Sequence, residues 1–471
     1  MHYAIITFGC RVNQADSLRI EEDLRAAGGV CTSAERADLV VVNTCSVTAS
    51  ADQGARQTIR RIARDNPSVR IVATGCYATR CPGDLAALPN VLTVIRNDDK
   101  LDFASGVAQV FRPAEQTTAT RNGDGPCGAT IEPGVAGRTA YTLRVQTGCE
   151  EHCAYCIIPS TRGSSRSVPI DSVLREVERV ASAGYKEIAL TGVHLGSYGR
   201  DLTPASSLAA LLRALETVDA DVRFRISSLE PMDCTREIVD LVARGGRFLP
   251  HFHLPLQHAS DRLLALMRRP YTLDDYRRLV DDIRRRLTHA AIGSDIIVGF
   301  PGETDEDFAA NAAYLPSSPL THLHVFPYSD RPGTEASKMR GKVSGSVVRE
   351  RGRQLREIGA GLARRFRESQ IGTVRPALTL EDGTLAVTDN YLKIRIPPGY
   401  GRNERLDVTV PAASGSDLHQ AGERLAGRLL TRRFGDQLTA RRADVAPARL
   451  AHRHDHTALG ERPREAVHRF V

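Results

Sequence analysis

The chain has 471 residues, of which 41% are hydrophobic and 25% charged, with ten cysteines and a formal net charge of +7. No run of 18 apolar residues occurs, which excludes a transmembrane helix and membrane partners, and the N-terminus lacks the charged and apolar regions of a signal peptide. We therefore expect a cytoplasmic protein of roughly two to four domains, whose cysteines bind metal or act in catalysis instead of forming disulfides. The basic balance is compatible with nucleic-acid binding.

The first 110 residues alternate apolar runs with helical patterns. Strands are predicted at Tyr3–Thr7, Ala37–Asn43, Val69–Thr74 and Val91–Ile95, and a helix at Asp16–Ala27. Buried apolar runs that alternate with helices indicate a parallel sheet, so this N-terminal domain is predicted to be α/β. Residues 111–138 have no periodicity and contain Pro, Gly, Thr, Asn and Asp, which is typical of a linker.

From residue 139 to about 330 the β–α alternation continues. Six strands are predicted, at Tyr141–Gln146, Lys186–Thr191, Val222–Ser227, Phe252–Leu256, Ile292–Val298 and His322–Phe326. Helices are expected between them, at Ile170–Ala183, Leu273–Leu287 and Asp305–Tyr314, the last opened by a capping-box pattern of Thr304 and Asp307. The pattern favours a parallel sheet that is open or partly closed as a barrel.

The C-terminal part has three further segments. Residues 345–370 are predicted to form one basic helix, either with a solvated arginine face or in contact with nucleic acid. Residues 371–437 read as short strands with Gly and Pro turns, which indicates a small β-barrel. The stretch 438–471, rich in Arg, His and Pro, is expected to be a poorly ordered tail.

Three cysteines, Cys149, Cys153 and Cys156, follow the first strand of the second α/β region with C-x₃-C-x₂-C spacing. Three thiolates can hold three corners of a four-iron cluster and leave one iron open. The alternative is a structural zinc site with His152 as fourth ligand, but such sites often use two C-x₂-C pairs and no second pair follows nearby.

A second set of cysteines, Cys10, Cys45 and Cys76, is distributed, and each comes just after a predicted strand of the N-terminal domain. The loops after parallel strands meet at one edge of a sheet, so these three thiols are predicted to converge. The alternative is that they are buried structural cysteines, because free cysteine is often buried. Four more cysteines fit no such pattern and are taken as core or incidental thiols: Cys31, Cys81, Cys127 and Cys234.

The combination of motifs resembles the methylthiotransferase family of radical S-adenosylmethionine (SAM) enzymes. The segments that carry the resemblance span about residues 1–435 and are Thr7–Gln14, Val42–Thr48, Thr74–Ala78, Gly148–Gly163 and Asp295–Thr304. Gly9–Gln14 and His324–Thr334 are most similar to the tRNA N6-threonylcarbamoyladenosine branch. The resemblance implies three domains: an N-terminal domain with an auxiliary cluster, a central partial (β/α)₆ radical SAM barrel and a C-terminal TRAM β-barrel that binds RNA.

By this resemblance, two [4Fe–4S] clusters are held by the two cysteine sets, and SAM binds the open iron of the Cys149/Cys153/Cys156 cluster. Contacts to the SAM are expected from Tyr155 and Gly192 and from three polar residues near strand ends, Ser228, Gln257 and Asp295. For the polar residues, turn and capping roles remain the alternative. Pro-Leu-Gln-His-Ala-Ser at 255–260 departs from the family pattern, because His258 and Ala259 replace Ser-Gly.

The implied reaction transfers a methylthio group to C2 of N6-threonylcarbamoyladenosine at position 37 in the anticodon loop of tRNA. Its implied partners are the tRNA, an electron donor such as flavodoxin or ferredoxin, and a sulfur source. Tyr391 and Tyr400 are expected either to stack on RNA bases or to be buried barrel tyrosines. The alternative substrates are isopentenyladenosine in tRNA and a ribosomal-protein aspartate. An alternative of another class is a zinc-stabilised RNA-binding protein without turnover.

Overall fold

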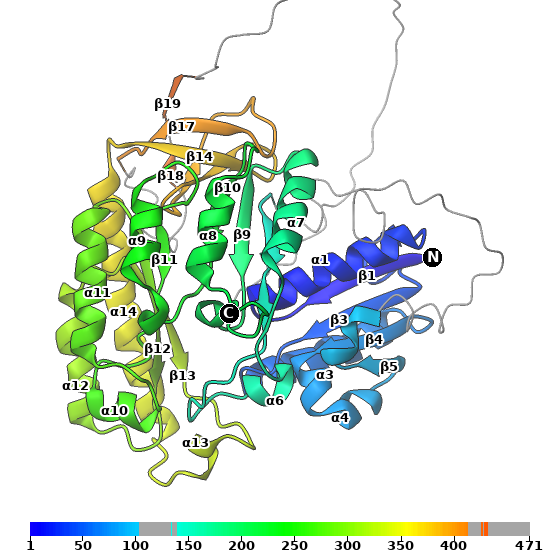
Figure 1. Ribbon diagram of the computed structural model, residues 1–471. Coiled ribbons are helices and arrows are strands. Elements are labelled where there is room, and N and C mark those ends of the chain that lie inside the picture. Colours follow the sequence, from blue (N-terminus) through cyan, green and yellow to red (C-terminus); the bar gives the residue numbers. More distant parts are fainter. Residues whose placement is uncertain (103–132, 134–138, 413–424, 427, 432–471) are drawn as a thin grey trace, which may run out of the picture.

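The computed structural model describes residues 1–102, 133, 139–412, 425–426 and 428–431 (Figure 1). Apart from Pro133, the predicted linker at 111–138 lies outside these residues, as does the predicted tail at 438–471. Within the described part of the chain, no helix is both long and apolar enough to cross a membrane.

The N-terminal region is a parallel five-stranded sheet in the order β2-β1-β3-β4-β5. Its strands are β1 (His2–Thr7), β2 (Val30–Cys31), β3 (Leu39–Thr44), β4 (Arg70–Gly75) and β5 (Val91–Ile95). Its helices are α1 (Arg11–Ala26), α2 (Ala49–Asp65), α3 (Cys76–Arg80), α4 (Pro82–Ala86) and η1 (Asp98–Asp102). The four predicted strands are confirmed, and the added edge strand β2 is too short and exposed to give a sequence signal.

Alternate residues of β3 face two different clusters of apolar side chains. Val40 and Val42 pack in a cluster that includes residues of α2, and Leu39 and Val41 pack in one that includes residues of α1. Such two-sided burial explains the continuous apolar run of the strand. The helix predicted at Asp16–Ala27 starts five residues too late, because α1 begins at Arg11, directly after the extended backbone of Cys10.

The central region contains six parallel strands in two three-stranded sheets, β10-β9-β6 and β11-β12-β13. These are β6 (Tyr141–Arg144), β9 (Glu187–Thr191), β10 (Arg223–Ile226), β11 (His251–His253), β12 (Ala291–Val298) and β13 (His322–Pro327). A parallel bridge between Phe224 and Phe248 joins the two sheets. All six predicted strands are present, and their sequential order is that of a partly closed barrel.

Four of these strands are shorter than predicted, and the first and the fourth lose most at their carboxyl ends. The first ends at Arg144, and Gln146–Thr147 forms β7, which pairs antiparallel with β8 (Arg166–Ser167). The fourth ends at His253, because the chain turns at Gln257, whose φ is +69°. The β7–β8 hairpin encloses the cysteine loop, so the early break is what creates that loop.

Helices cover the outer face of the six strands, and their apolar residues form the largest core of the protein. In Figure 1 the last long helices lie beside β12 and β13, away from the N-terminal sheet. The helices are α6 (Ile158–Arg162), α7 (Ile170–Ser182), η3 (Leu195–Ser197), α8 (Leu208–Glu216), η4 (Pro231–Asp233), α9 (Arg236–Ala243), α10 (Asp261–Leu266), α11 (Leu273–Arg286), α12 (Asp305–Tyr314), η5 (Leu315–Ser317), α13 (Glu335–Lys338) and α14 (Gly345–Gln370). The predicted capping box of Thr304 and Asp307 and the helix at 345–370 are both confirmed.

The C-terminal strands form a mainly antiparallel sheet in the order β18-β16-β15-β14-β17-β19. They are β14 (Val374–Leu380), β15 (Leu385–Thr388), β16 (Lys393–Arg395), β17 (Arg405–Thr409), β18 (Leu425–Ala426) and β19 (Arg428–Thr431). This sheet lies against the amino ends of the barrel strands (Figure 1), where the Arg405 guanidinium donates to the Lys186 carbonyl oxygen at 2.7 Å.

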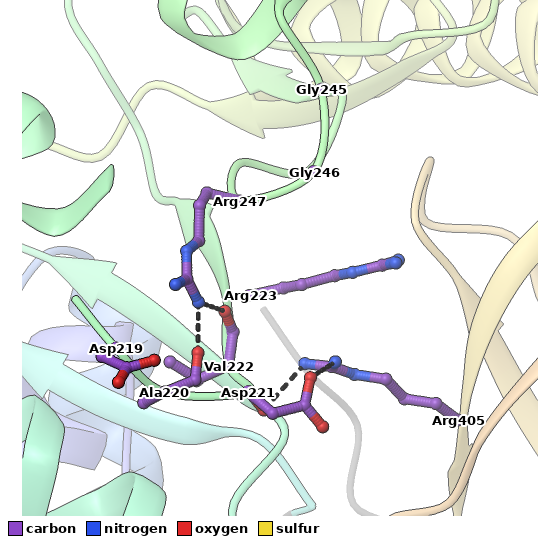
Figure 2. Close-up of a pocket in the computed structure, with 9 residues that line it drawn as sticks. All are labelled: Asp219, Ala220, Asp221, Val222, Arg223, Gly245, Gly246, Arg247 and Arg405. Carbon is purple, nitrogen blue, oxygen red and sulfur yellow. Dashed lines mark hydrogen bonds and ion pairs between the residues drawn. The ribbon is translucent and has the colours of Figure 1, made fainter. Parts of the chain in front are cut away.

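A pocket of about 620 Å³ opens at this border (Figure 2). Three arginines line it: Arg247 donates to backbone carbonyls, Arg405 pairs with Asp221, and Arg223 has no partner among the residues drawn. Arg223 begins β10, so the pocket is at the opposite end of the strands from the cysteine loops.

Gly148→Ala is expected to destabilise the protein more than Gly184→Ala. Both glycines have positive φ, +76° and +91°, which costs a non-glycine residue about 1–3 kcal/mol. Only at Gly148 does an added Cβ clash, at 1.9 Å from the Ser164 carbonyl oxygen, whereas nothing lies within 4 Å at Gly184. Thermal unfolding of both variants checks this, and equal losses in Tm would contradict the packing described for the cysteine loop.

Candidate functional site

The loop between β7 and β8 carries Cys149, Cys153 and Cys156. Its backbone is tied at both ends, because the Cys149 N–H donates to Gly163 at 3.0 Å and the Ala154 N–H donates to the Met267 carbonyl at 3.0 Å. The three thiols are free and partly buried. Burial raises the pKa of Cys156 to about 12, and the charges of Cys153 and Cys149 add to this effect. The loop therefore brings three thiol groups together, and burial favours the protonated form of Cys153 and Cys156 until a cation replaces the proton.

Two buried cationic side chains approach the sulfurs of this loop. Arg269 Nη1 donates to Cys153 Sγ at 3.2 Å, and Arg269 also pairs with Glu230. His194 Nδ1 lies 3.8 Å from Cys149 Sγ, while its Nε2 is 2.7 Å from Asp233. Each cation thus has a carboxylate behind it and a sulfur in front of it.

The protonation of His194 follows from these contacts. Burial alone would lower its pKa, but the hydrogen bonds to Asp233 and Cys149 outweigh burial and raise the pKa to about 10. For Cys153 the effect of burial has the opposite sign. Burial raises the pKa of this thiol, and the Arg269 guanidinium offsets only part of that rise. Charged donors next to sulfur stabilise thiolates, which is the form that binds metal.

The second cysteine set lies at the edge of the N-terminal sheet. Cys10 follows β1, Cys45 follows β3 and Cys76 begins α3 after β4, and these three strands are neighbours in the sheet. Burial and the charges of the other two cysteines raise the pKa of Cys45 to about 12. A Cβ on Gly9 would lie 2.6 Å from Cys45 Sγ, so glycine is needed for the Cys10 loop to approach Cys45. The expected convergence is therefore present.

A buried ion cluster joins the two cysteine regions. Asp16 on α1 pairs with Lys100 at 2.8 Å and with Arg162 at 3.0 Å, and it also pairs with Arg144 of β6. Arg162 ends α6, directly beyond the C-x₃-C-x₂-C loop, and donates to Asn13 at 2.5 Å. Burial would raise the pKa of Asp16, but the surrounding cations hold it well below its ordinary value. The carboxylate is therefore ionised and ties the two domains together.

A second cluster of the same design lies beside Cys45. Asp52 on α2 pairs with Arg80 at 2.5 Å and with Arg331 at 2.6 Å, and Arg331 also donates to Ser46 at 2.8 Å. Arg331 belongs to the loop after β13 of the barrel. The cysteine-bearing edge of the N-terminal sheet is thus held to the barrel at two places by buried charge.

The donor sets fit iron–sulfur clusters. Each offers three thiols that form no disulfide. Cys thiolates are the usual ligands of such clusters, and three of them leave one position open. His152 is exposed, and the structure gives it no contact with the three sulfurs among the residues described. The chemistry of the site therefore favours a cluster over the zinc alternative with His152.

The predicted SAM-contact residues occupy different environments. Tyr155 packs edge-on against Phe300 at 6.5 Å between ring centroids. Gly192 lies against Gln146, since an added Cβ would be 2.9 Å from Gln146 Oε1. Ser228 is exposed after β10.

Gln257 is buried and has positive φ, so it is a backbone outlier held by pairing with β12. Such outliers are found at functional sites. Asp295 lies inside β12, three residues before its end, where its Oδ1 lies 2.9 Å from His253 Nε2 and 3.1 Å from His324 Nδ1. His258, the departure from the family pattern, is fully buried and contacts Ser260 and Asn311, so it belongs to the core.

Sequence reasoning missed Gln146, Glu230, Asp233 and Arg269. Gln146 Oε1 accepts from the backbone N–H groups of Val193 and His194, both at 2.9 Å, and so shapes the 192–194 turn. Glu230 and Asp233 lie in the segment after the carboxyl end of β10, which ends at Ile226, and this is a positional signal that could have found them. Arg269 gave no such signal, because only the fold brings it to Cys153.

Two protein-family patterns match the chain: the radical SAM superfamily at residues 143–315 and "Uncharacterized protein family UPF0004" at residues 2–96. The threonylcarbamoyladenosine tRNA methylthiotransferase MtaB of Aquifex aeolicus is 36% identical over 84% of this chain and 96% of its own length. The tRNA-2-methylthio-N(6)-dimethylallyladenosine synthase of Acidothermus cellulolyticus is 33% identical over 80% of this chain and 77% of its own.

Among solved structures, the radical SAM methyltransferase TsrM of Kitasatospora setae, with cobalamin and a [4Fe–4S] cluster bound, aligns with a TM-score of 0.50 and 18% identity over 71% of this chain and 73% of its own. At 18% identity, that likeness shows a shared fold and nothing more. The sequence relationship reaches further, and the chain belongs to the methylthiotransferase family of radical SAM enzymes, whose cofactors are SAM and [4Fe–4S] clusters.

Proposed function

We propose that the protein transfers a methylthio group to C2 of N6-threonylcarbamoyladenosine at position 37 of tRNA. The observation that carries the proposal is the pair of three-cysteine sets at the carboxyl edges of two sheets, joined through the Asp16–Arg162 contact. Insertion of sulfur at an unactivated aromatic carbon needs both a radical and a sulfur carrier, and two cluster sites side by side suit that need.

We assign one [4Fe–4S] cluster to Cys149, Cys153 and Cys156 and the other to Cys10, Cys45 and Cys76. When bound, a reduced cluster with SAM supplies the radical chemistry that no acidic or basic side chain can provide. Arg269 and His194 stabilise the thiolates of the first set. Tyr155, Gly192, Ser228, Gln257 and Asp295 are proposed to shape the SAM pocket, with Asp295 acting through His253 and His324.

The domain division that suits this function is 1–110, 139–370 and 371–437, joined by the linker at 111–138. We propose that the C-terminal sheet is the RNA-binding TRAM domain. The arginines of the pocket in Figure 2 support this, because they lie at the border of that sheet and guanidinium groups bind phosphate. An electron donor such as flavodoxin or ferredoxin and a sulfur source complete the reaction.

The threonylcarbamoyl substrate is favoured over isopentenyladenosine by the relatives. The Aquifex protein that carries the threonylcarbamoyl name has higher identity and coverage than the Acidothermus protein that carries the dimethylallyl name. A non-catalytic zinc protein is disfavoured, because the chain belongs to a family of enzymes.

Deletion of the gene is expected to abolish 2-methylthio-N6-threonylcarbamoyladenosine and to leave its unmethylthiolated precursor. Mass spectrometry of tRNA nucleosides from the deletion strain, with a strain complemented by the intact gene as control, checks this. An unchanged level of the methylthio nucleoside would sink the substrate assignment, and loss of the isopentenyl form instead would point to the other branch.

Anaerobic reconstitution is expected to give about eight irons per chain, because two cuboidal clusters are proposed. Cys149→Ala should abolish formation of 5′-deoxyadenosine from SAM, whereas Cys234→Ala, in a buried thiol outside both sets, should preserve it. Iron and sulfide analysis with product chromatography measures both. Four irons in the intact protein would refute the N-terminal cluster.

Arg269→Gln is expected to lower the midpoint potential of the first cluster by at least about 60 mV, a roughly tenfold change for one electron. The reason is that a charged donor to sulfur favours the more negative reduced state, and this donor is 3.2 Å from Cys153 Sγ. Arg268→Gln is the matched control, since its partner is Glu335 and it is half exposed. Spectroscopic redox titration is the measurement, and equal shifts in both variants would contradict the assigned role.

A further inference from the structure

Arg11 is a cationic side chain that pairs with no carboxylate among the described residues. It is the first residue of α1, directly after Cys10, and its side chain is half-buried. In the part of the chain that the structure describes, its one hydrogen bond runs from Nη2 to the Tyr391 hydroxyl oxygen at 3.1 Å, and no carboxylate lies within ion-pair distance. Nearby arginines are compensated: Arg162 by Asp16 and Arg225 by Glu187. A half-buried, unpaired guanidinium is costly unless something else binds it.

The Tyr391 ring, which carries the hydroxyl that receives this bond, makes two contacts with barrel residues. Tyr391 comes from the C-terminal sheet, has φ of +72° and is 41% exposed. Its ring lies 4.6 Å from the His251 ring and 4.9 Å from the Arg225 guanidinium. The barrel therefore fixes Tyr391, and Tyr391 in turn fixes one edge of Arg11. Among the residues that the structure describes, the other N–H groups of the guanidinium have no hydrogen-bond partner and can bind a ligand.

The inner face of β13 continues this polar surface. The His322 ring lies 6.3 Å from His251 and 5.5 Å from His324, whose side chain is 54% exposed. Asp295 Oδ1 contacts His324 Nδ1, and Nε2 of the same ring has no hydrogen-bond partner within the described ranges. Just beyond β13, Ser329 Oγ accepts from the Ala49 N–H at 2.9 Å, close to Cys45. The surface thus runs from Cys10 toward the Cys45 loop.

We propose that Arg11 binds the carboxylate of the substrate's N6 arm, with the Tyr391 hydroxyl and His324 as supporting hydrogen-bond partners. The inference rests on the proposed function, which places a threonylcarbamoyl arm, with one carboxylate, at this adenosine. A guanidinium matches a carboxylate with two parallel hydrogen bonds. Asp295, the anion on the same surface, is already engaged by His253 and His324 and so does not compete for Arg11.

The same contact accounts for discrimination against an apolar arm. A dimethylallyl group cannot compensate Arg11, and it would seal the guanidinium away from water without a partner. Sites built to bind a polar group reject analogues that lack it, because the buried partner is left unsatisfied. Arg11 is therefore a specificity-determining residue, distinct from the cysteines that hold the clusters.

The test uses the full-length, cluster-loaded protein and three anticodon stem-loops. These carry N6-threonylcarbamoyladenosine, its methyl ester, or unmodified adenosine at position 37, and affinity is measured by fluorescence anisotropy without oxygen. Intact protein is expected to bind the acid at least tenfold more tightly than the ester. Arg11→Gln should erase that difference and leave the affinities for the ester and for adenosine within about twofold.

Two further variants make the result interpretable. Arg60→Gln removes the same charge from an exposed position on α2 and should retain the preference for the acid. Arg11→Lys keeps the charge but loses the planar fork, so it should recover only part of the preference. Iron content measured for each variant shows that the N-terminal cluster site is intact.

Three outcomes overturn the inference. Arg11→Gln could weaken all three stem-loops equally, which would make Arg11 a contact to the RNA backbone. It could leave the preference unchanged, or the intact protein could fail to distinguish acid from ester. The nucleoside analysis separates this from the proposed function: methylthio-threonylcarbamoyladenosine that is lost on deletion, together with any of these outcomes, leaves the reaction standing and removes only the role of Arg11.

Discussion

The buried carboxylate of Asp16 is the contact on which the arrangement of the site depends. It is 4% exposed and sits among Lys100, Arg144 and Arg162, which come from the N-terminal sheet region, from β6 and from the end of the cysteine loop. Removal of one partner from a buried ion pair typically costs about 3–5 kcal/mol, because a charge is left uncompensated. Asp52 and Arg331 form a second buried ion pair at the other side of the sheet. Together the two ion clusters fix the position of the Cys149–Cys156 loop relative to Cys10, Cys45 and Cys76.

Electrostatics explains why so many charged side chains are buried around the two cysteine sets. Burial and the charges of neighbouring cysteines raise the pKa values of Cys45 and Cys156, so these two thiols resist ionisation. Cluster assembly must remove these protons, and fixed cations lower the cost of the resulting negative charge. Arg269, His194 and Arg162 stand where that charge develops, and each pairs with a carboxylate that holds it in place.

Most of the secondary structure was accessible from sequence because buried parallel strands read as continuous apolar runs. The failures have local causes. The helix α1 begins earlier than its apolar periodicity because its first turn carries polar side chains: Arg11 contacts Tyr391, and the buried Asn13 bonds to Thr44 and Arg162. The strand at Tyr141 breaks early because β7 turns away to pair with β8. The sequence predicted Asp295 at a strand end and gave no sign of its contacts with His253 and His324.

Sequence alone determined the ligand chemistry: the C-x₃-C-x₂-C spacing and the cysteines after three parallel strands follow from short-range order and from the rule that such strands share one edge. The tertiary structure decided what surrounds those thiols. Arg269 is 116 residues from Cys153 and Tyr391 is 380 residues from Arg11, and contacts over such separations arise only when the chain is folded. The physical reason is that the order of residues along the chain decides which side chains a loop carries. The charged groups that shift the pKa values of those side chains come from distant parts of the chain, which pack against the loop only in the folded protein.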